Sequence, residues 1–270
     1  MRSRRRRLTL SSLTLGDVDF VRRVEAAAGA GFSGIGLRAE DYVAARDAGL
    51  SDADMAAVLA DHGITVTEVE LLAGWAGSVS FDPAQREKEE TILHVARTFG
   101  ADHVNAGLFQ PLPIEVVVPA FAALCRRMGE ARVALEFMPF GCLPDLAATW
   151  EVLRRADPLN AGLLIDAWHW ARSGAVPQDL AAVPADAIIV VQLCDVAEQP
   201  MSDLRQETLH HRLAPGRGYG DVPGLLRALR DHGVDAPISV EVMSDELLAL
   251  GVEVAAEQVM AGAIEVLAAS

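Results

Sequence analysis

The feature that most constrains the fold of this chain is an alternation of short apolar runs with longer segments that carry helix signals. The apolar runs predict eight β-strands, at residues 8–12, 34–38, 64–70, 103–106, 133–138, 162–166, 188–193 and 238–242. Segments rich in Ala, Leu, Arg and Glu separate them, which is typical of parallel βα units. Eight such units in a chain of 270 residues predict an α/β fold that is a closed (β/α)8 barrel, the TIM barrel, rather than a doubly wound open sheet.

A single domain spanning residues 1–270 is expected, because no Gly/Ser/Pro-rich linker divides the chain. The stretch GAGFSGIG does not carry the GxGxxG fingerprint of a dinucleotide-binding fold. Helix boundaries agree with the βα rhythm. Ser51 opens the capping-box-like SDAD, Asp82 precedes a first-turn Pro83, and Gly63 and Gly233 stand where helices are expected to end.

The composition argues against some classes of binding partner. The net charge of −15 and the pI of about 4.8 argue against a nucleic-acid or anionic-membrane surface, which would need clustered cationic residues. No apolar run approaches the roughly 18 to 20 residues of a membrane span. The three cysteines lack CxxC spacing, so we expect a reducing, cytoplasmic location. The basic start MRSRRRR is interpreted as a tail before the first strand, because the segment after it is too short and polar for an export signal.

Polar residues interrupt four of the later predicted strands near their carboxyl ends. They are Glu136 in VALEFM, Asp166 in LLIDAW, Gln192 in IIVVQLCD and Glu241 in ISVEVM. Barrel strands are covered on both faces and should be apolar, and the carboxyl ends of barrel strands carry the active site. A shared target for the four side chains is therefore expected. The alternative is that each one separately caps a helix or bonds a neighbouring amide.

A divalent cation is the target that fits these four side chains. Three crowded carboxylates would take up protons unless a cation lay between them, and the only lysine in the chain is Lys88. Oxygen ligands suit Mn²⁺ or Mg²⁺, with Co²⁺ or Zn²⁺ as alternatives.

Other residues are candidates for the substrate pocket. His169 follows Asp166 by three residues and is expected in a loop at the mouth, as a substrate contact and not as a metal ligand; a packed histidine is the alternative. Trp168 and Trp170 could form the pocket wall or pack in the barrel. Arg38, Glu70 and Trp75 end or follow early strands and could line the pocket or be ordinary rim residues.

The loop HHRLAPGRGYGDVP after the seventh predicted strand is glycine-rich. Such a loop can hold phosphate in a barrel, but a tight turn leading to a helix cap at Asp221 is the preferred interpretation. Arg212 is its best candidate for contacting an anion or a carbonyl. His94 and His103 lie away from the expected mouth and are interpreted as structural.

The segments VALEFMP, LLIDAWH, VVQLCD, HRLAPGRG and SVEV, in this order, resemble the xylose isomerase-like TIM barrel superfamily, which includes sugar-phosphate isomerases and epimerases. The resemblance covers nearly the whole chain. It implies a divalent metal held by Glu136, Asp166, Gln192 and Glu241, with His169 and Arg212 contacting substrate, and relatives of this kind are often homo-oligomers. Gln192 departs from the histidine common in ketose epimerases and inosose isomerases and is similar to the 3-dehydroshikimate dehydratase branch, as is the HRL and PG stretch. Met138 does not match the polar residue of some of those dehydratases.

These features together predict a metal-dependent isomerase or epimerase that acts on a small polyhydroxylated carbonyl compound, phosphorylated or not, through a cis-enediolate. Glu136 and Glu241 would exchange the proton as base and acid, while His169 and Arg212 orient and polarise the substrate oxygens. A lyase resembling 3-dehydroshikimate dehydratase and a non-catalytic metal or sugar binder are the alternatives. An endonuclease of the same superfamily is disfavoured, because this acidic chain offers neither a cationic groove nor several metal-binding histidines.

Overall fold

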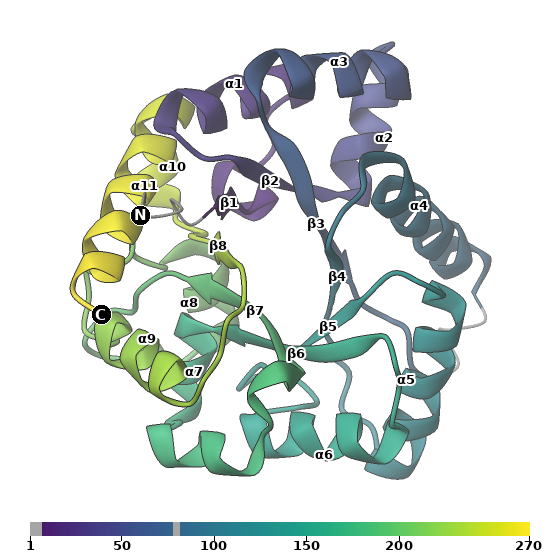
Figure 1. The fold of residues 1–270 in the computed structure, drawn as a ribbon, viewed down its shortest axis with the longest axis vertical. Coiled ribbons are helices and arrows are strands. Elements are labelled where there is room, and N and C mark those ends of the chain that lie inside the picture. The colour runs from purple at the N-terminus through teal and green to yellow at the C-terminus, as the bar shows by residue number, and fades with distance from the viewer. Residues whose placement is uncertain (1–6, 78–81) are drawn as a thin grey trace.

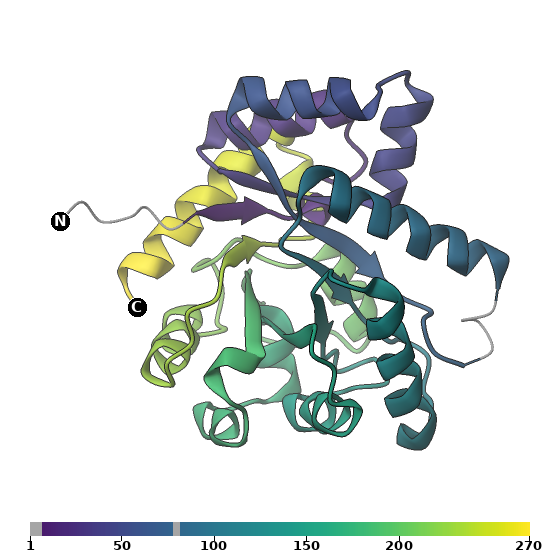
Figure 2. The same ribbon diagram turned by 45° about the vertical axis from the view of Figure 1, so that its right-hand side comes forward.

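The structure, a computed structural model, describes residues 7–77 and 82–270. In this part of the chain eight parallel strands pair in sequence order, and the last strand pairs with the first to close a barrel. Helices form a layer around the strands, as Figures 1 and 2 show from two sides. The predicted (β/α)8 barrel is confirmed. Most of the basic tail predicted at residues 1–7 lies outside the described residues.

The strands agree closely with the predicted ranges. The observed bounds of β2, β4 and β7 are the predicted ones. Strands β1, β5 and β8 end two residues earlier than predicted, and β3 ends two residues later. The observed strands are β1 (Leu8–Leu10), β2 (Gly34–Arg38), β3 (Thr65–Leu72), β4 (His103–Ala106), β5 (Val133–Glu136), β6 (Ala161–Asp166), β7 (Ile188–Leu193) and β8 (Ile238–Val240).

The helices begin and end where local sequence chemistry favours it. The hydroxyl of Ser51 and the carboxylate of Asp54 form the expected capping box, Asp82 caps a helix whose first residue is Pro83, and Gly63 ends a helix with φ of 65°. The α-helices are α1 (Phe20–Ala30), α2 (Ala39–Asp47), α3 (Asp52–His62), α4 (Pro83–Phe99), α5 (Ile114–Met128), α6 (Leu146–Ala156), α7 (Ala167–Ser173), α8 (Leu204–His210), α9 (Val222–Asp231), α10 (Asp245–Leu248) and α11 (Val252–Ala268). Short 3-10 turns occur at η1 (Ser12–Leu15), η3 (Pro177–Ala182) and η4 (Ala185–Ala187).

The two faces of each strand have different surroundings. Residues on the outer face, such as Val104, Leu135 and Val191, pack against the helices in the main hydrophobic core. Residues two positions before Glu136, Asp166 and Gln192 share their face of the strand, and they are apolar: Ala134, Leu164 and Val190 belong to a separate buried cluster. The barrel interior beneath this half of the predicted site is therefore apolar.

The other half of the barrel interior is polar. Glu68 on β3 is fully buried, and its carboxylate accepts hydrogen bonds from Ser239 Oγ at 2.5 Å, His103 Nε2 at 3.2 Å and Asn105 Nδ2 at 3.3 Å. These partners come from β8 and β4, so the carboxylate links strands on either side of the barrel. His103 is thus a structural residue, as predicted, and its partner is a buried carboxylate that the sequence pattern did not reveal.

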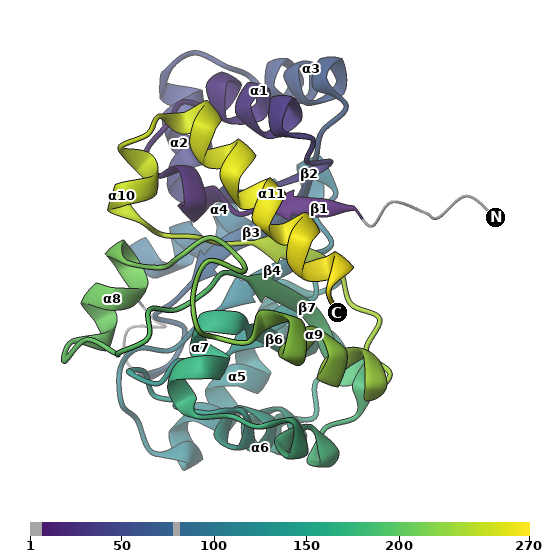
Figure 3. The same ribbon diagram turned by 90° about the vertical axis from the view of Figure 1, so that its left-hand side faces the viewer.

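The carboxyl ends of the strands lie at one end of the barrel. Figure 3 shows α8 and α10 at this end, opposite the start of β1 and the end of α11. Within the described residues, none of the helices combines the length and the apolar character that would let it cross a bilayer.

Candidate active site

The four polar residues predicted at strand ends lie together at the carboxyl end of the barrel. Glu136 and Asp166 are the last residues of β5 and β6, Gln192 is next to last in β7, and Glu241 directly follows β8. All four side chains are buried. Glu136, Gln192 and Glu241 line a cavity of about 70 Å³, and Asp166 lies beside it.

Asp166 makes two kinds of contact. Its Oδ1 accepts a hydrogen bond from the backbone amide of His169 at 2.8 Å and so caps α7, while its Oδ2 accepts from Arg212 Nη1 at 2.9 Å. The helix-cap alternative is therefore correct for one oxygen of this carboxylate. His169 lies in the first turn of α7 and not in a loop as expected, because the cap at Asp166 starts a helix directly after the strand.

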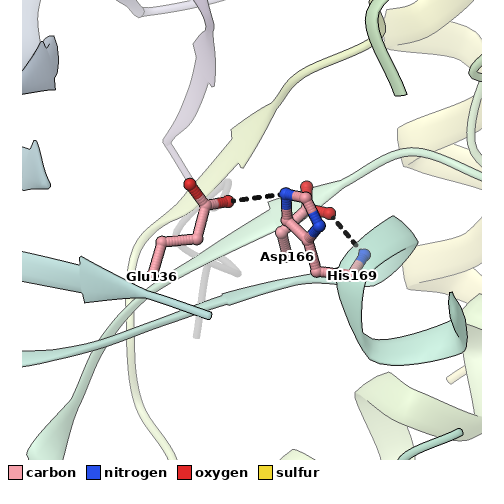
Figure 4. A group of neighbouring side chains, drawn as sticks. All are labelled: Glu136, Asp166 and His169. Atoms are coloured by element: carbon pink, nitrogen blue, oxygen red, sulfur yellow. Dashed lines mark hydrogen bonds and ion pairs between the residues drawn. The ribbon is translucent and has the colours of Figure 1, made fainter. Parts of the chain in front are cut away.

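His169 lies closer to the carboxylates than the sequence suggested. Its Nε2 is 3.4 Å from Glu136 Oε1, and Figure 4 shows the imidazole facing the Glu136 carboxylate. One potential ligand atom from each of Glu136, Asp166 and His169 lies within 4.8 Å of the others. The geometry therefore admits His169 as a metal ligand, in contrast to the expectation that it contacts substrate only.

Arg212 supplies a buried cation beside these carboxylates. Its guanidinium is buried and bonds Asp166 at 2.9 Å and Glu241 Oε2 at 3.1 Å. Thr208 holds it from the other side with its hydroxyl and its backbone carbonyl. Trp168 is fully buried, with its ring 5.7 Å from the guanidinium, so this residue supports Arg212 and does not line the cavity.

A second hydrogen-bonded group joins Glu241 to Glu70. Ser11 Oγ lies 2.8 Å from Glu70 Oε2 and 3.2 Å from Glu241 Oε1, and Gln192 Nε2 donates to the same Glu241 oxygen at 3.1 Å. The backbone amide of Ser12 donates to Glu70 Oε1 at 2.9 Å. Glu70 therefore lines the cavity, as predicted, and is held there by the turn that follows β1.

Burial and crowding control the ionisation of these groups. Loss of solvent and the neighbouring carboxylates raise the pKa of Glu136 and of Glu70 well above the ordinary glutamate value. Burial also raises the pKa of Glu241 to about 7, although Arg212 opposes this shift. Burial lowers the pKa of His169 to about 3, so its imidazole is neutral. One guanidinium does not neutralise four carboxyl groups, and a cation would favour their ionised form.

Several buried polar atoms of residues that line the cavity have no hydrogen-bond partner among the described residues. They are Glu136 Oε1, His169 Nδ1, Gln192 Oε1 and Asn105 Oδ1. Unpaired buried polar atoms are uncommon because no protein hydrogen bond replaces the one they lose to water. An oxygen-rich set of this kind, with one imidazole, fits a divalent cation together with a ligand that carries hydroxyl donors.

Other candidates lie elsewhere. Arg38 is not among the residues that line the cavity; it pairs with Asp41 at 2.6 Å and with Asp17 at 2.9 Å, which agrees with the alternative of a rim residue and not with a place in the pocket. The indole of Trp75 is buried and donates to the carbonyl of Gly107. Trp170 is part of the hydrophobic core.

The loop after β7 forms a turn, as preferred from the sequence. Asp195 accepts hydrogen bonds from the amides of Gly218 at 3.0 Å and Gly220 at 2.8 Å, so these amides are occupied by a side chain of the same loop. Asp221 caps α9 through the amide of Gly224. Only Arg212 from this stretch reaches the cavity.

Sequence reasoning missed several residues of the cavity wall, among them Asn105, Phe109, Phe140 and Thr208. Phe109 and Phe140 stack with ring centroids 6.2 Å apart. Polar residues in the first and fourth predicted strands were a usable signal for Ser11 and Asn105, since both interrupt apolar runs near the strand ends. The aromatic residues lie in loops, where no periodic pattern identifies them.

A larger hollow of about 730 Å³ lies outside the barrel between α4 and α5. Its wall is mostly apolar, with an ion pair of Arg127 and Glu89 at 2.7 Å. The strand ends do not reach it, so the convergence of polar groups, and not the size of the hollow, identifies the candidate site.

Comparison with known proteins agrees with this architecture. A model of the xylose isomerase-like TIM barrel family matches residues 24–269. The chain is 25% identical over 234 residues to a 3-dehydroshikimate dehydratase of Pseudomonas putida, covering 83% of this chain and 36% of the dehydratase. It is 27% identical over 124 residues to an inosose isomerase of Bacillus licheniformis, covering 45% of this chain and 44% of the isomerase. The chain thus spans less than half the length of either relative. A crystal structure of the IolI protein with a bound zinc atom superposes with a TM-score of 0.85 at 20% identity, over 97% of this chain and 98% of that one.

Proposed function

This chain belongs to the xylose isomerase-like TIM barrel family, and from that premise we propose that it is a divalent-metal-dependent isomerase or epimerase of a small polyhydroxylated carbonyl compound. One observation carries the proposal. Residues from consecutive strands line one small buried cavity and carry buried polar atoms without a hydrogen-bond partner, and a second carboxylate, Glu241, lines the same cavity. A relative of known activity, the inosose isomerase, acts on a compound of this class.

We assign Glu136, Asp166, Gln192 and Glu241 as the residues that would hold the metal, with His169 as an additional candidate. The ion would be Mn²⁺ or Mg²⁺, with Co²⁺ or Zn²⁺ as alternatives. When bound, a divalent cation supplies positive charge that stabilises the negative charge developing on the substrate oxygens.

The surroundings of the two glutamates differ and suggest their roles. Oε1 of Glu136 accepts no hydrogen bond among the described residues and lies 3.4 Å from His169 Nε2, so it would take the proton from the substrate carbon and leave a cis-enediolate. Both oxygens of Glu241 are held, Oε1 by Ser11 and Gln192 and Oε2 by Arg212, so this group would return a proton from a fixed position. Neutral His169 would orient a substrate oxygen, while Arg212 keeps Asp166 and Glu241 in place.

A lyase is the second candidate, because the same proton abstraction can be followed by loss of a β-hydroxyl as water. Two observations favour it: glutamine stands at position 192, and the dehydratase relative matches 83% of this chain. A metal or sugar binder without catalysis is the third possibility.

Proton exchange separates these candidates. The Mn²⁺-loaded protein is incubated in D₂O with scyllo-inosose, D-fructose and 3-dehydroshikimate, and the substrates are followed by ¹H NMR and ultraviolet absorption. Deuterium incorporation or a rearranged ketone supports the isomerase. A catechol product without turnover of the other two compounds supports the lyase, and no reaction with any of the three contradicts both.

Glu136→Gln is expected to lower kcat at least about 100-fold, since it removes the base and keeps the shape of the side chain. Glu89→Gln is the matched control, because Glu89 is also buried but pairs with Arg127 outside the barrel. Unchanged kcat in Glu136→Gln would exclude its assigned role.

A further inference from the structure

Asn105 is a residue of the cavity wall to which the proposed chemistry assigns no task. It lies on β4, is 2% exposed and lines the cavity together with Glu136 and Gln192. Its Nδ2 is 3.3 Å from Glu68 Oε2, and its Oδ1 has no partner among the described residues. The amide thus has one satisfied end and one unsatisfied end.

Glu68 decides which end of the amide is satisfied. A carboxylate only accepts hydrogen bonds, so it must face the NH₂ group of Asn105 and not its oxygen. Glu68 is itself held by Ser239 Oγ on Oε1 and by His103 Nε2 on Oε2. Because this carboxylate is fully buried and linked to two further strands, it gives the amide a fixed orientation.

The fixed amide leaves Asn105 Oδ1 as an unpaired acceptor in the cavity wall. The neighbouring strands contribute the carboxyl groups of Glu70, which is bonded to Ser11 and Ser12, and of Glu136, which is assigned to metal binding. The other wall residues near Asn105 are apolar: Leu71, Phe109 and Met138. Asn105 Oδ1 is therefore an unpaired acceptor on this wall that is not assigned to the metal, and it can only accept a hydrogen bond.

We propose that Asn105 contacts the substrate directly and accepts a hydrogen bond from one of its hydroxyl groups, with Glu68 as the positioning residue that fixes the amide. The proposal rests on the proposed function, since it requires a hydroxylated ligand in the cavity. It adds a specificity contact on β4, outside the residues assigned to metal binding and proton transfer. A ligand without a hydroxyl group at this place would leave a buried acceptor unpaired.

Asn105→Leu tests the contact, because leucine has a similar volume and no acceptor. For whichever of scyllo-inosose and 3-dehydroshikimate the Mn²⁺-loaded wild type converts, KM should rise about tenfold while kcat stays within about twofold. The Kd of the unreactive polyol myo-inositol, measured by calorimetry, should rise in parallel. Asn105→Ala provides the same comparison if the leucine variant does not fold.

Glu68 is tested by two substitutions. Glu68→Gln keeps an acceptor for Asn105 Nδ2 and should leave KM within about threefold of the wild type, whereas Glu68→Met removes it and should reproduce the KM of Asn105→Leu. Asn160→Leu is the matched control, because this amide bonds the carbonyls of Cys125, Gly129 and Ala131 away from the cavity. It should lower the melting temperature without changing KM.

The two possible failures differ in where they appear. If the wild type converts a substrate and Asn105→Leu shows the same KM and the same myo-inositol Kd, the substrate contact is wrong and the proposed function stands. If the wild type neither converts nor binds any of the three probes, the proposed function fails and the assignment of Asn105 fails with it.

Discussion

Among single residues, Arg212 has the largest influence on the charge of the cavity. Among the residues that the structure describes, it is the only guanidinium in the cavity wall, and it bonds both Asp166 and Glu241. Arginine remains charged when buried, so its contribution does not depend on pH in the physiological range. The cavity therefore contains a permanent positive charge that holds both carboxyl groups in place before a metal arrives.

Replacement of this side chain should be severe. Arg212→Met leaves Asp166 and Glu241 buried without their cation, and we expect the free energy of unfolding to fall by about 3–5 kcal/mol. Arg127→Met, which breaks the partly exposed pair with Glu89, should lower it by about 1 kcal/mol or less. Urea unfolding of the metal-free proteins measures both, and equal losses would contradict a special role for Arg212.

The raised carboxyl pKa values predict how pH affects the metal-free protein. The pKa of Glu241 in the folded state is about 7, above its ordinary value of 4.5, so the folded state binds more protons than the unfolded state between these values. Stability contributed by this group is full at low pH and is lost as pH rises through about 7. His169 acts in the opposite sense, because its pKa is lowered from 6.5 to about 3, but this contribution is complete above pH 6.5.

Below pH 6.5 the two contributions oppose each other, so we expect the melting temperature of chelator-treated protein to fall as the pH rises from about 6.5 through about 7, the folded pKa of Glu241. Glu241→Gln, which cannot ionise, should flatten this decline, and differential scanning fluorimetry measures it. A melting temperature that rises over the same interval in the wild type would contradict the raised pKa.

Part of the site could be predicted residue by residue. A charged or amide side chain at the end of an apolar strand predicts a functional site, and this pattern identifies Glu136, Asp166, Gln192 and Glu241. The pattern does not identify the role of Glu68, because its hydrogen-bond partners lie on β4 and β8 and are distant in sequence. Only the closed barrel brings these strands together.

Among the elements, β2 has an unusual inner face. Gly34 and Gly36 alternate on this strand, and a Cβ atom on Gly36 would lie 1.7 Å from Glu70 Oε1 and 3.0 Å from the backbone nitrogen of Ser12. The missing side chain leaves room for the Glu70 carboxyl group, which lines the cavity from the neighbouring strand. The sequence of β2 is therefore adapted to a side chain of β3.

Gly36→Ala should displace Glu70 from its bonds with Ser11 and Ser12 and lower the free energy of unfolding by about 1–3 kcal/mol. Gly29→Ala is the matched control, because a Cβ atom there meets open space and alanine favours the helix. Combining Gly36→Ala with Glu70→Ala should recover part of the loss, since the two changes share one contact. Chemical denaturation of the three variants checks this, and simple additivity would contradict it.

Three strands end earlier than the hydrophobic pattern predicts. The predicted ranges 8–12, 133–138 and 238–242 extend past the observed ends of β1, β5 and β8, and the extra residues include Ser11, Met138 and Glu241. All three lie at the mouth, where the chain leaves the ladder of strand hydrogen bonds to form the cavity wall. Apolar or alternating character continues there because the residues remain buried, so burial alone does not mark the end of a strand.

At the scale of the whole molecule, the metal should couple to folding. A ligand that binds only the folded state stabilises it by about 2.7 kcal/mol at 100 times its Kd, which corresponds to a rise in melting temperature of roughly 5–10 °C for a chain of this size. We expect this rise when Mn²⁺ is added to chelator-treated protein, and little or no rise in Glu136→Gln combined with Asp166→Asn. Elemental analysis of purified protein supplies the second measurement; no bound metal and no thermal shift would contradict the site.

The barrel architecture was the most predictable level, because eight repeats of one pattern support each other even where single boundaries are off by two residues. Contacts between residues of different βα repeats were far less predictable. The register of neighbouring strands, the glycine positions of β2 and the helix after Asp166 all follow from packing in three dimensions.

The start of β1 and the end of α11 lie away from α8 and α10, at the opposite end of the barrel from the cavity (Figure 3). A tether attached at either position would therefore face away from the opening through which ligands arrive. Immobilisation on a sensor chip through such a tether, or linkage in tandem to a second enzyme, should leave ligand entry unobstructed.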